Sequence, residues 1–234
     1  MSYEREGGKM KKIMNLYFSP METFKALNEK PDWIIPIVVT VVVVLIMTMI
    51  ALPKVILPDR AKAITEMDQI PEEYKEKALE RLEGVGPYIQ TPIAIVIFSF
   101  ILLFAQTGIL MLVFLISGSR APFKKMLAIV SYSYLTGIPE VILKTMMMLI
   151  KKSTHVFTSL ALVVPNMDLK SPLFKVLSRI DIFTIWQLSL IALGCSVIYG
   201  VDRKKSFSII FGLWVLWLII VLIVASVLPK GIGF

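Results

Sequence analysis

Long uncharged stretches dominate the pattern of hydrophobic and polar positions along this chain. Four of them run for 20 or more residues without a charged side chain: Trp33–Pro53, Tyr88–Ser119, Ile182–Val201 and Ser206–Pro229. A fifth stretch, Met126–Ile150, is interrupted only by Glu140 and Lys144. About 20 helical residues cross a hydrocarbon layer roughly 30 Å thick, so each stretch is long enough to span a membrane. We therefore expect five transmembrane helices, at about residues 33–53, 90–118, 126–150, 182–200 and 207–228.

Composition supports a membrane environment for most of the chain. The 234 residues are 56% hydrophobic, above the apolar share of a typical soluble domain. The predicted fold class is all-α, an integral membrane bundle of five transmembrane helices with short amphipathic interfacial helices. We expect residues 1–32 to form a cytoplasmic N-terminal arm and residues 33–228 to form the membrane domain.

Basic residues beside the predicted spans give the chain a direction. Two short connections, Ser119–Lys125 and Asp202–Lys205, carry three basic residues each. Short basic loops face the cytoplasm, which predicts a cytoplasmic N-terminus, an outer C-terminus at Pro229–Phe234 and a location in the cell membrane. The net charge of +8 is explained by these flanks and by a lipid partner, so we expect no nucleic-acid partner.

A short amphipathic helix is predicted just before the first span. Ser19 can cap it, Pro20 suits its first position, and Glu22 stands where a capping box requires an acid. Phe24 and Leu27 follow at helical spacing. We expect this helix on the cytoplasmic leaflet, either as a structural lead-in or as a docking helix that uses Ser19, Glu22 and Phe24.

The two longer connections, Lys54–Pro87 and Lys151–Arg179, are predicted on the outer side of the membrane, opposite the cytoplasm. The first, Lys54–Pro87, contains the pattern of a helix at about Pro71–Glu83, with another turn or two around Asp59–Asp68. The second contains Ser171 followed by proline, a further serine cap. The apolar run Val156–Pro165 is too short to cross, so it is either re-entrant or rests on the outer surface.

The charged pair in the third span is the first candidate for function. Glu140 and Lys144 are four residues apart, with the acid first, which is the favourable order for a helical ion pair. Pro139 precedes them and is expected to kink the helix. The pair either lines a polar path or partner groove, or lies near the outer interface with Lys144 reaching toward water. We favour the structural interpretation.

Hydroxyl groups cluster in the same span, at Ser131–Tyr134. Such groups in lipid usually bond to a backbone carbonyl or to a neighbouring helix, so packing is the default interpretation. The alternative is a polar path, for which the candidate residues are Glu140, Lys144, Tyr132, Tyr134 and Gln106.

No catalytic or metal-binding set is recognisable in the sequence. The single cysteine, Cys195, lies inside a span, and His155 is the only histidine. A zinc site built on histidines, or a histidine-dependent triad, therefore lacks its parts. We expect a protein that is not an enzyme and that holds no cofactor and no metal.

Three blocks of the sequence resemble the Yip family, multi-span membrane proteins first associated with Rab GTPases. They are Phe18–Phe24 with Leu27, Pro31 and Trp33; Arg120–Ile142; and Asp181–Trp186 with Leu188 and Gly194. The resemblance covers about residues 15–228. It implies an all-helical fold with a cytoplasmic N-terminus and a C-terminus on the far side.

The resemblance also implies a role without catalysis. Eukaryotic members that engage Rab proteins carry a longer polar region before the first span, whereas here 32 residues precede it. We therefore expect a prokaryotic-type member and do not carry a Rab-type partner over to this chain. The predicted function is to organise or assist membrane protein complexes or trafficking, with the lipid bilayer and other membrane proteins, such as a transporter complex, as partners. The alternative is a small transporter or channel component that uses a polar path around the third span.

Overall fold

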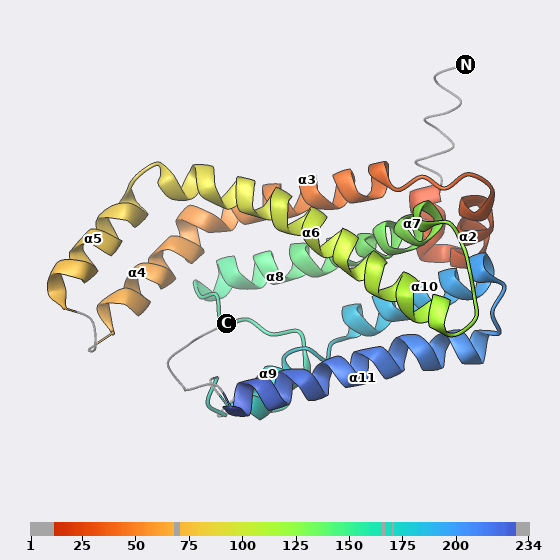
Figure 1. Ribbon diagram of the computed structural model, residues 1–234. Coiled ribbons are helices and arrows are strands. Elements are labelled where there is room, and N and C mark those ends of the chain that lie inside the picture. Colours follow the sequence, from red (N-terminus) through yellow and green to blue (C-terminus); the bar gives the residue numbers. More distant parts are fainter. Residues whose placement is uncertain (1–11, 68–70, 165–166, 170, 228–234) are drawn as a thin grey trace, which may run out of the picture. The chain divides into compact units, whose positions relative to one another are not determined.

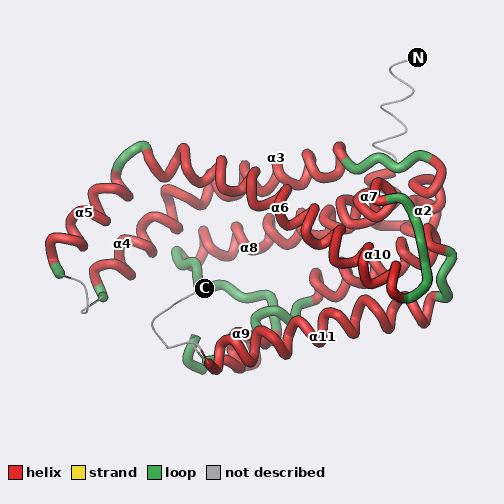
Figure 2. The backbone as a smooth tube through the Cα atoms, viewed as in Figure 1, coloured by secondary structure: helices red, strands yellow, loops and turns green. Residues whose placement is uncertain are grey.

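The computed structural model describes residues 12–67, 71–164, 167–169 and 171–227. This part of the chain consists of helices and loops, with a single isolated bridge between Ser159 and Asp181 (Figures 1 and 2). It divides into two compact units. Unit 1 comprises Met1–Val38, Leu103–Gly137 and Phe157–Phe234, and unit 2 comprises Val39–Leu102 and Ile138–Val156.

Five of the described helices are long and apolar enough to cross a membrane. They are Ile34–Thr65, Gly86–Ile116, Phe123–Lys151, Ile182–Tyr199 and Arg203–Val227. The shortest has 18 residues, which at 1.5 Å per residue is about 27 Å, close to the thickness of the hydrocarbon layer. The predicted all-α, five-span fold is confirmed. The outer C-terminus was predicted at Pro229–Phe234, which lies outside the described residues.

The first long helix continues beyond its predicted end at Pro53. Helix α3 (Ile34–Ala51) passes through a π-helical turn (Leu52–Ile56) into α4 (Leu57–Thr65). Because Pro53 has no backbone N–H, the ordinary ladder is interrupted there, and the wider π turn carries the helix past it. The predicted loop beginning at Lys54 is therefore wrong as far as residue 58, where the chain is helical. The helical turns predicted around Asp59–Asp68 are present in α4 as far as Thr65.

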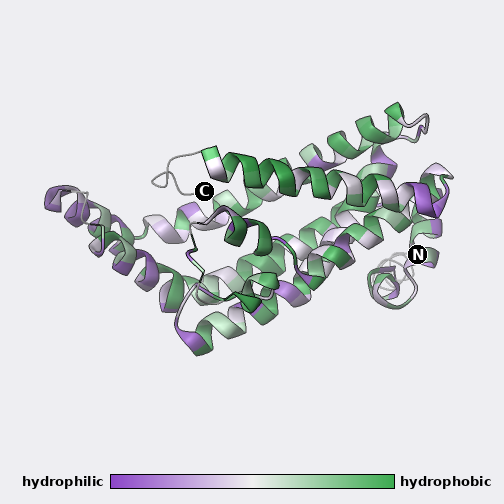
Figure 3. Ribbon diagram, turned by 90° about the horizontal axis from the view of Figure 1, so that it is seen from below, coloured by the Kyte–Doolittle hydropathy of each residue, from purple (hydrophilic) through white to green (hydrophobic). Residues whose placement is uncertain are grey.

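Unit 2 also contains the charged helix α5 (Glu72–Glu83). It starts directly after Pro71 and stops at Gly84, which confirms the predicted helix. Lys77 pairs with Glu73 at 2.7 Å, as expected for residues four apart. Figure 3 shows hydrophilic residues gathered on α4 and α5, whereas hydrophobic residues cover the long helices.

The third long helix is interrupted in its middle. It consists of α7 (Phe123–Ser133), a 3₁₀ turn (Tyr134–Thr136) and α8 (Gly137–Lys151). The irregularity predicted at Pro139 is present, but it lies one turn earlier. The reason is that proline removes the hydrogen bond to the carbonyl four residues before it.

The core of unit 1 lies where α2 (Pro20–Glu29), α7 and α10 (Ile182–Tyr199) meet. Phe24, Leu27, Ile129 and Ile191 are fully buried there. Helix α11 (Arg203–Val227) lies beside α10 (Figure 1). The Ser206 hydroxyl donates to the Ala192 carbonyl at 2.7 Å.

Helix caps divide into those formed by side chains and those formed by the backbone. Ser171 caps α9 (Pro172–Leu177) as predicted, since its hydroxyl accepts from the Phe174 N–H at 3.1 Å. The capping box predicted at Ser19 and Glu22 is wrong: Ser19 stands at the N-cap of α2, but its side chain forms no cap bond. The Ser19 carbonyl accepts from the backbone of Glu22 and Thr23 instead.

Candidate functional site

A tyrosine from the N-terminal helix at residues 12–18 completes the irregular turn of the third span. The Tyr17 hydroxyl donates to the Leu135 carbonyl at 2.6 Å. Leu135 is the residue whose carbonyl would accept from position 139 in a regular helix, and Pro139 cannot donate. Tyr17 therefore satisfies the acceptor that the proline leaves open, and its ring packs edge-on against Trp186 at 5.5 Å.

Two tyrosines of the hydroxyl cluster have different surroundings in unit 1. The Tyr134 hydroxyl donates to the Gln106 Oε1 at 2.8 Å, so two of the predicted residues meet. Tyr132 is fully buried, and its hydroxyl has no hydrogen-bond partner among the described residues. Asp32 Oδ2 is likewise buried without a hydrogen-bond partner among these residues.

The remaining hydroxyls of the cluster, and that of the neighbouring Thr136, bond to backbone carbonyls of the same span. Ser131 donates to the Ala128 carbonyl, Ser133 to Ile129 and Thr136 to Ser133, at 3.2, 2.8 and 2.8 Å. A hydroxyl that donates to a carbonyl of its own helix has no free donor for a solute that crosses the membrane. This arrangement favours packing over a polar path.

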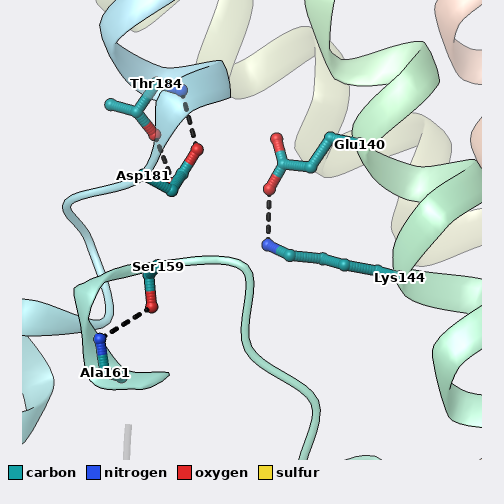
Figure 4. Close-up of polar contacts among 6 residues, drawn as sticks. All are labelled: Glu140, Lys144, Ser159, Ala161, Asp181 and Thr184. Atoms are coloured by element: carbon teal, nitrogen blue, oxygen red, sulfur yellow. Dashed lines mark hydrogen bonds and ion pairs between the residues drawn. The ribbon is translucent and has the colours of Figure 1, made fainter. Parts of the chain in front are cut away.

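Glu140 and Lys144 belong to unit 2 and form an ion pair (Figure 4). The same figure draws two side-chain caps of unit 1, in which the Thr184 N–H donates to the Asp181 carboxylate and the Ala161 N–H donates to the Ser159 hydroxyl. The Glu140 and Lys144 side chains are 24% and 33% exposed. The predicted pairing is confirmed. Each charge already has its counter-ion on the same helix. The geometry therefore supports a structural ion pair rather than two charged groups that are free to bind a solute or a partner.

The predicted docking residues differ in their accessibility. Phe24 is fully buried, and Ser19 is half-buried, whereas Glu22 is exposed. The apolar side of α2 thus packs within the protein, so its expected contact with the leaflet is wrong for Phe24. Exposed apolar side chains lie one helix earlier, where Met14 is 56% and Phe18 is 81% exposed.

Sequence reasoning missed a contact that closes unit 2. Asp59 Oδ2 accepts from the Thr154 N–H at 2.5 Å and from the Thr154 hydroxyl at 2.8 Å. The two residues are 95 positions apart, so no local spacing could indicate the contact. Within the described ranges, no three His, Cys, Asp or Glu side chains are grouped so that they could hold a metal ion.

Comparison with known proteins gives one result. No curated protein and no solved structure matches this chain. The Yip1 domain matches residues 14–225, a range that includes all three blocks noted in the sequence and nearly all of the five long helices. The chain is a multi-pass membrane protein that belongs to the Yip1 domain family.

Proposed function

We propose that this protein is a non-enzymatic organiser of other membrane proteins, which it binds through the surface formed by Met14, Phe18 and Glu22. Yip1 family proteins are generally non-enzymatic trafficking proteins, which supports the class of function. On this proposal the chain is a prokaryotic-type member in the cell membrane, with its N-terminus in the cytoplasm and its C-terminus outside. The basic loops beside the spans support that direction.

The exposed phenylalanine carries the proposal. Phe18 is 81% exposed and lies four residues after Met14, so the two apolar side chains share one helical face. Glu22, four positions further along the chain, is exposed on α2. An exposed aromatic side chain with a charged rim is the composition of a protein contact, where aromatic residues contribute most of the binding energy.

The test is crosslinking and affinity purification from native membranes. The wild-type chain is compared with Phe18→Ser and with Phe98→Ser, a control that removes a phenylalanine that is 61% exposed on α6 (Gly86–Ile116). We expect a reproducible membrane-protein partner that is lost with Phe18→Ser and retained with Phe98→Ser. No reproducible partner for the wild type, or equal recovery with all three chains, contradicts the proposal.

A transporter or channel component is less well supported. Its candidate residues are occupied, since Glu140 pairs with Lys144 and Tyr134 donates to Gln106. Reconstituted flux that falls in both Glu140→Gln and Lys144→Met would favour this alternative over an organising role. Flux that is absent, or unchanged in both variants, would dismiss it.

A further inference from the structure

Unit 1 contains a hollow of about 530 Å³ at the end where its two basic loops lie. Its walls come from the end of α6, the connection after it and the last residue of α10: Met111, Leu115, Ser119, Arg120, Ala121, Pro122 and Tyr199. Small-molecule sites in proteins usually enclose about 300–1,000 Å³. The hollow is therefore large enough for part of a lipid.

The backbone around this hollow is held in place by a helix-ending turn. Gly118 adopts a φ of 85°, which favours glycine, and Gly118 and Ser119 donate to the Leu115 and Phe114 carbonyls at 3.0 and 2.9 Å. This is the Schellman pattern of helix termination. Lys205 adds a bond from its Nζ to the Ser117 carbonyl at 3.1 Å, which ties the second basic loop to the first.

The polar side of the hollow offers donors that have no acceptor. Among the described residues, Arg120 forms no ion pair and no hydrogen bond, and the Ser119 hydroxyl and the Ala121 N–H also lack a partner. The nearby carboxylate of Asp202 is taken up by the start of α11, where it accepts from the Lys204 N–H at 3.0 Å. The segments 117–125 and 201–205 together carry six basic residues and one acidic residue.

The rest of the lining is mostly apolar. It includes Met111, Leu115 and Pro122, and Leu115 is 42% exposed on a membrane-spanning helix. The Tyr199 ring forms part of the wall and is held by the Phe114 ring at 5.0 Å. A ligand that fits both sides has an anionic head and a hydrocarbon chain.

We propose that this hollow binds an anionic phospholipid. The Arg120 guanidinium, the Ser119 hydroxyl and the Ala121 N–H hold the phosphate, because charge-assisted bonds to phosphate are strong and guanidinium matches its geometry. The first carbons of an acyl chain lie along Met111 and Leu115. Inorganic phosphate shares the head-group chemistry but gains nothing from the apolar wall.

The experiment uses the full-length chain in neutral detergent, with native mass spectrometry to measure bound lipid. Phosphatidylglycerol is compared with phosphatidylcholine and with inorganic phosphate. We expect phosphatidylglycerol to bind about tenfold more tightly than phosphatidylcholine, and Arg120→Gln to remove about that factor. Lys124→Gln, a neighbouring cation that does not line the hollow, is the matched control and should change binding less than about twofold.

Two further arms separate the possible outcomes. Met111→Trp fills the apolar side without changing any charge, so it should weaken the lipid while Arg120 is intact. Equal loss in Arg120→Gln and Lys124→Gln would show a diffuse basic surface and overturn the proposal. Inorganic phosphate that displaces the lipid at the same concentration, or full binding in Met111→Trp, would overturn the lipid assignment.

Discussion

Replacing Gly194 with alanine should loosen the core of unit 1. A Cβ atom at this position would lie 2.8 Å from Ile129 Cγ2 and 2.8 Å from Phe24 Cε1. Real Cβ atoms essentially never approach other heavy atoms that closely. Both neighbours are fully buried, so neither side chain can swing out into solvent or lipid to make room.

The expected cost follows from two opposing effects. Overpacking a filled core costs about 1–3 kcal/mol, whereas alanine favours helix over glycine by about 1 kcal/mol. The net loss is about 0–2 kcal/mol, or about 1–3 kcal/mol relative to a glycine-to-alanine change that meets no clash. For a chain of this length each kcal/mol lowers the melting temperature by roughly 2–4 °C. Thermal unfolding in detergent, followed by tryptophan fluorescence, measures this change.

Two other glycines provide matched controls for the same substitution. A Cβ atom at Gly108 or Gly212 would meet nothing within 4 Å, so alanine there should leave the melting temperature unchanged or raise it slightly. Combining Gly194→Ala with Phe24→Leu should cost less than the sum of the two single changes, because the smaller side chain relieves the same clash. If Gly194→Ala is as harmless as Gly212→Ala, or if the two costs simply add, the close approach of α2 to α10 is refuted.

Three further predictions concern hydrogen bonds that join distant segments. Tyr134→Phe should lower the stability of unit 1 by about 0.6–1 kcal/mol, and a thermal double-mutant cycle with Gln106→Leu should show that the two changes do not add. Burial raises the pKa of the Tyr17 hydroxyl above its ordinary value of 10.0. Its contribution to the free energy of unfolding is therefore complete below pH 10.0 and is lost as the pH rises through the raised value. In Tyr17→Phe this loss of stability at alkaline pH, seen in a pH series of melting curves, should disappear. Asp59→Asn and Thr154→Val should each speed amide exchange around residue 154, because Asp59 accepts both bonds that hold this segment; exchange that is unchanged in both would show that the contact does not close unit 2.

The membrane fold could be predicted because its causes are local. Five apolar runs of sufficient length determine five helices, since a lipid environment leaves an isolated segment no other way to satisfy its backbone. The proline before α5 and the glycine after it likewise predicted the ends of this helix to within one residue. The first helix is the exception: Pro53 is a helix breaker by rule, but a π turn absorbs it, and no composition signal distinguishes the two outcomes.

The polar residues show where local reasoning ends. The Glu140–Lys144 pair depends on spacing along one helix, so it was predictable. Because Pro139 has no N–H, the carbonyl that loses its helical partner, that of Leu135, also follows from spacing in principle, but the donor that satisfies it does not. That donor, Tyr17, lies 118 positions earlier in the chain, so no local spacing could indicate it. The packing of Phe24 likewise depends on a distant residue. Its position on an amphipathic helix predicts a surface residue, but the absence of a side chain at Gly194 leaves room for its ring in the core. A side chain on a short amphipathic helix near a membrane can face lipid or protein with the same sequence pattern, and only the partner's shape decides which. For this chain the ring of Phe24 packs against a glycine 170 positions away, which is why the proposed binding surface includes Phe18 and not Phe24.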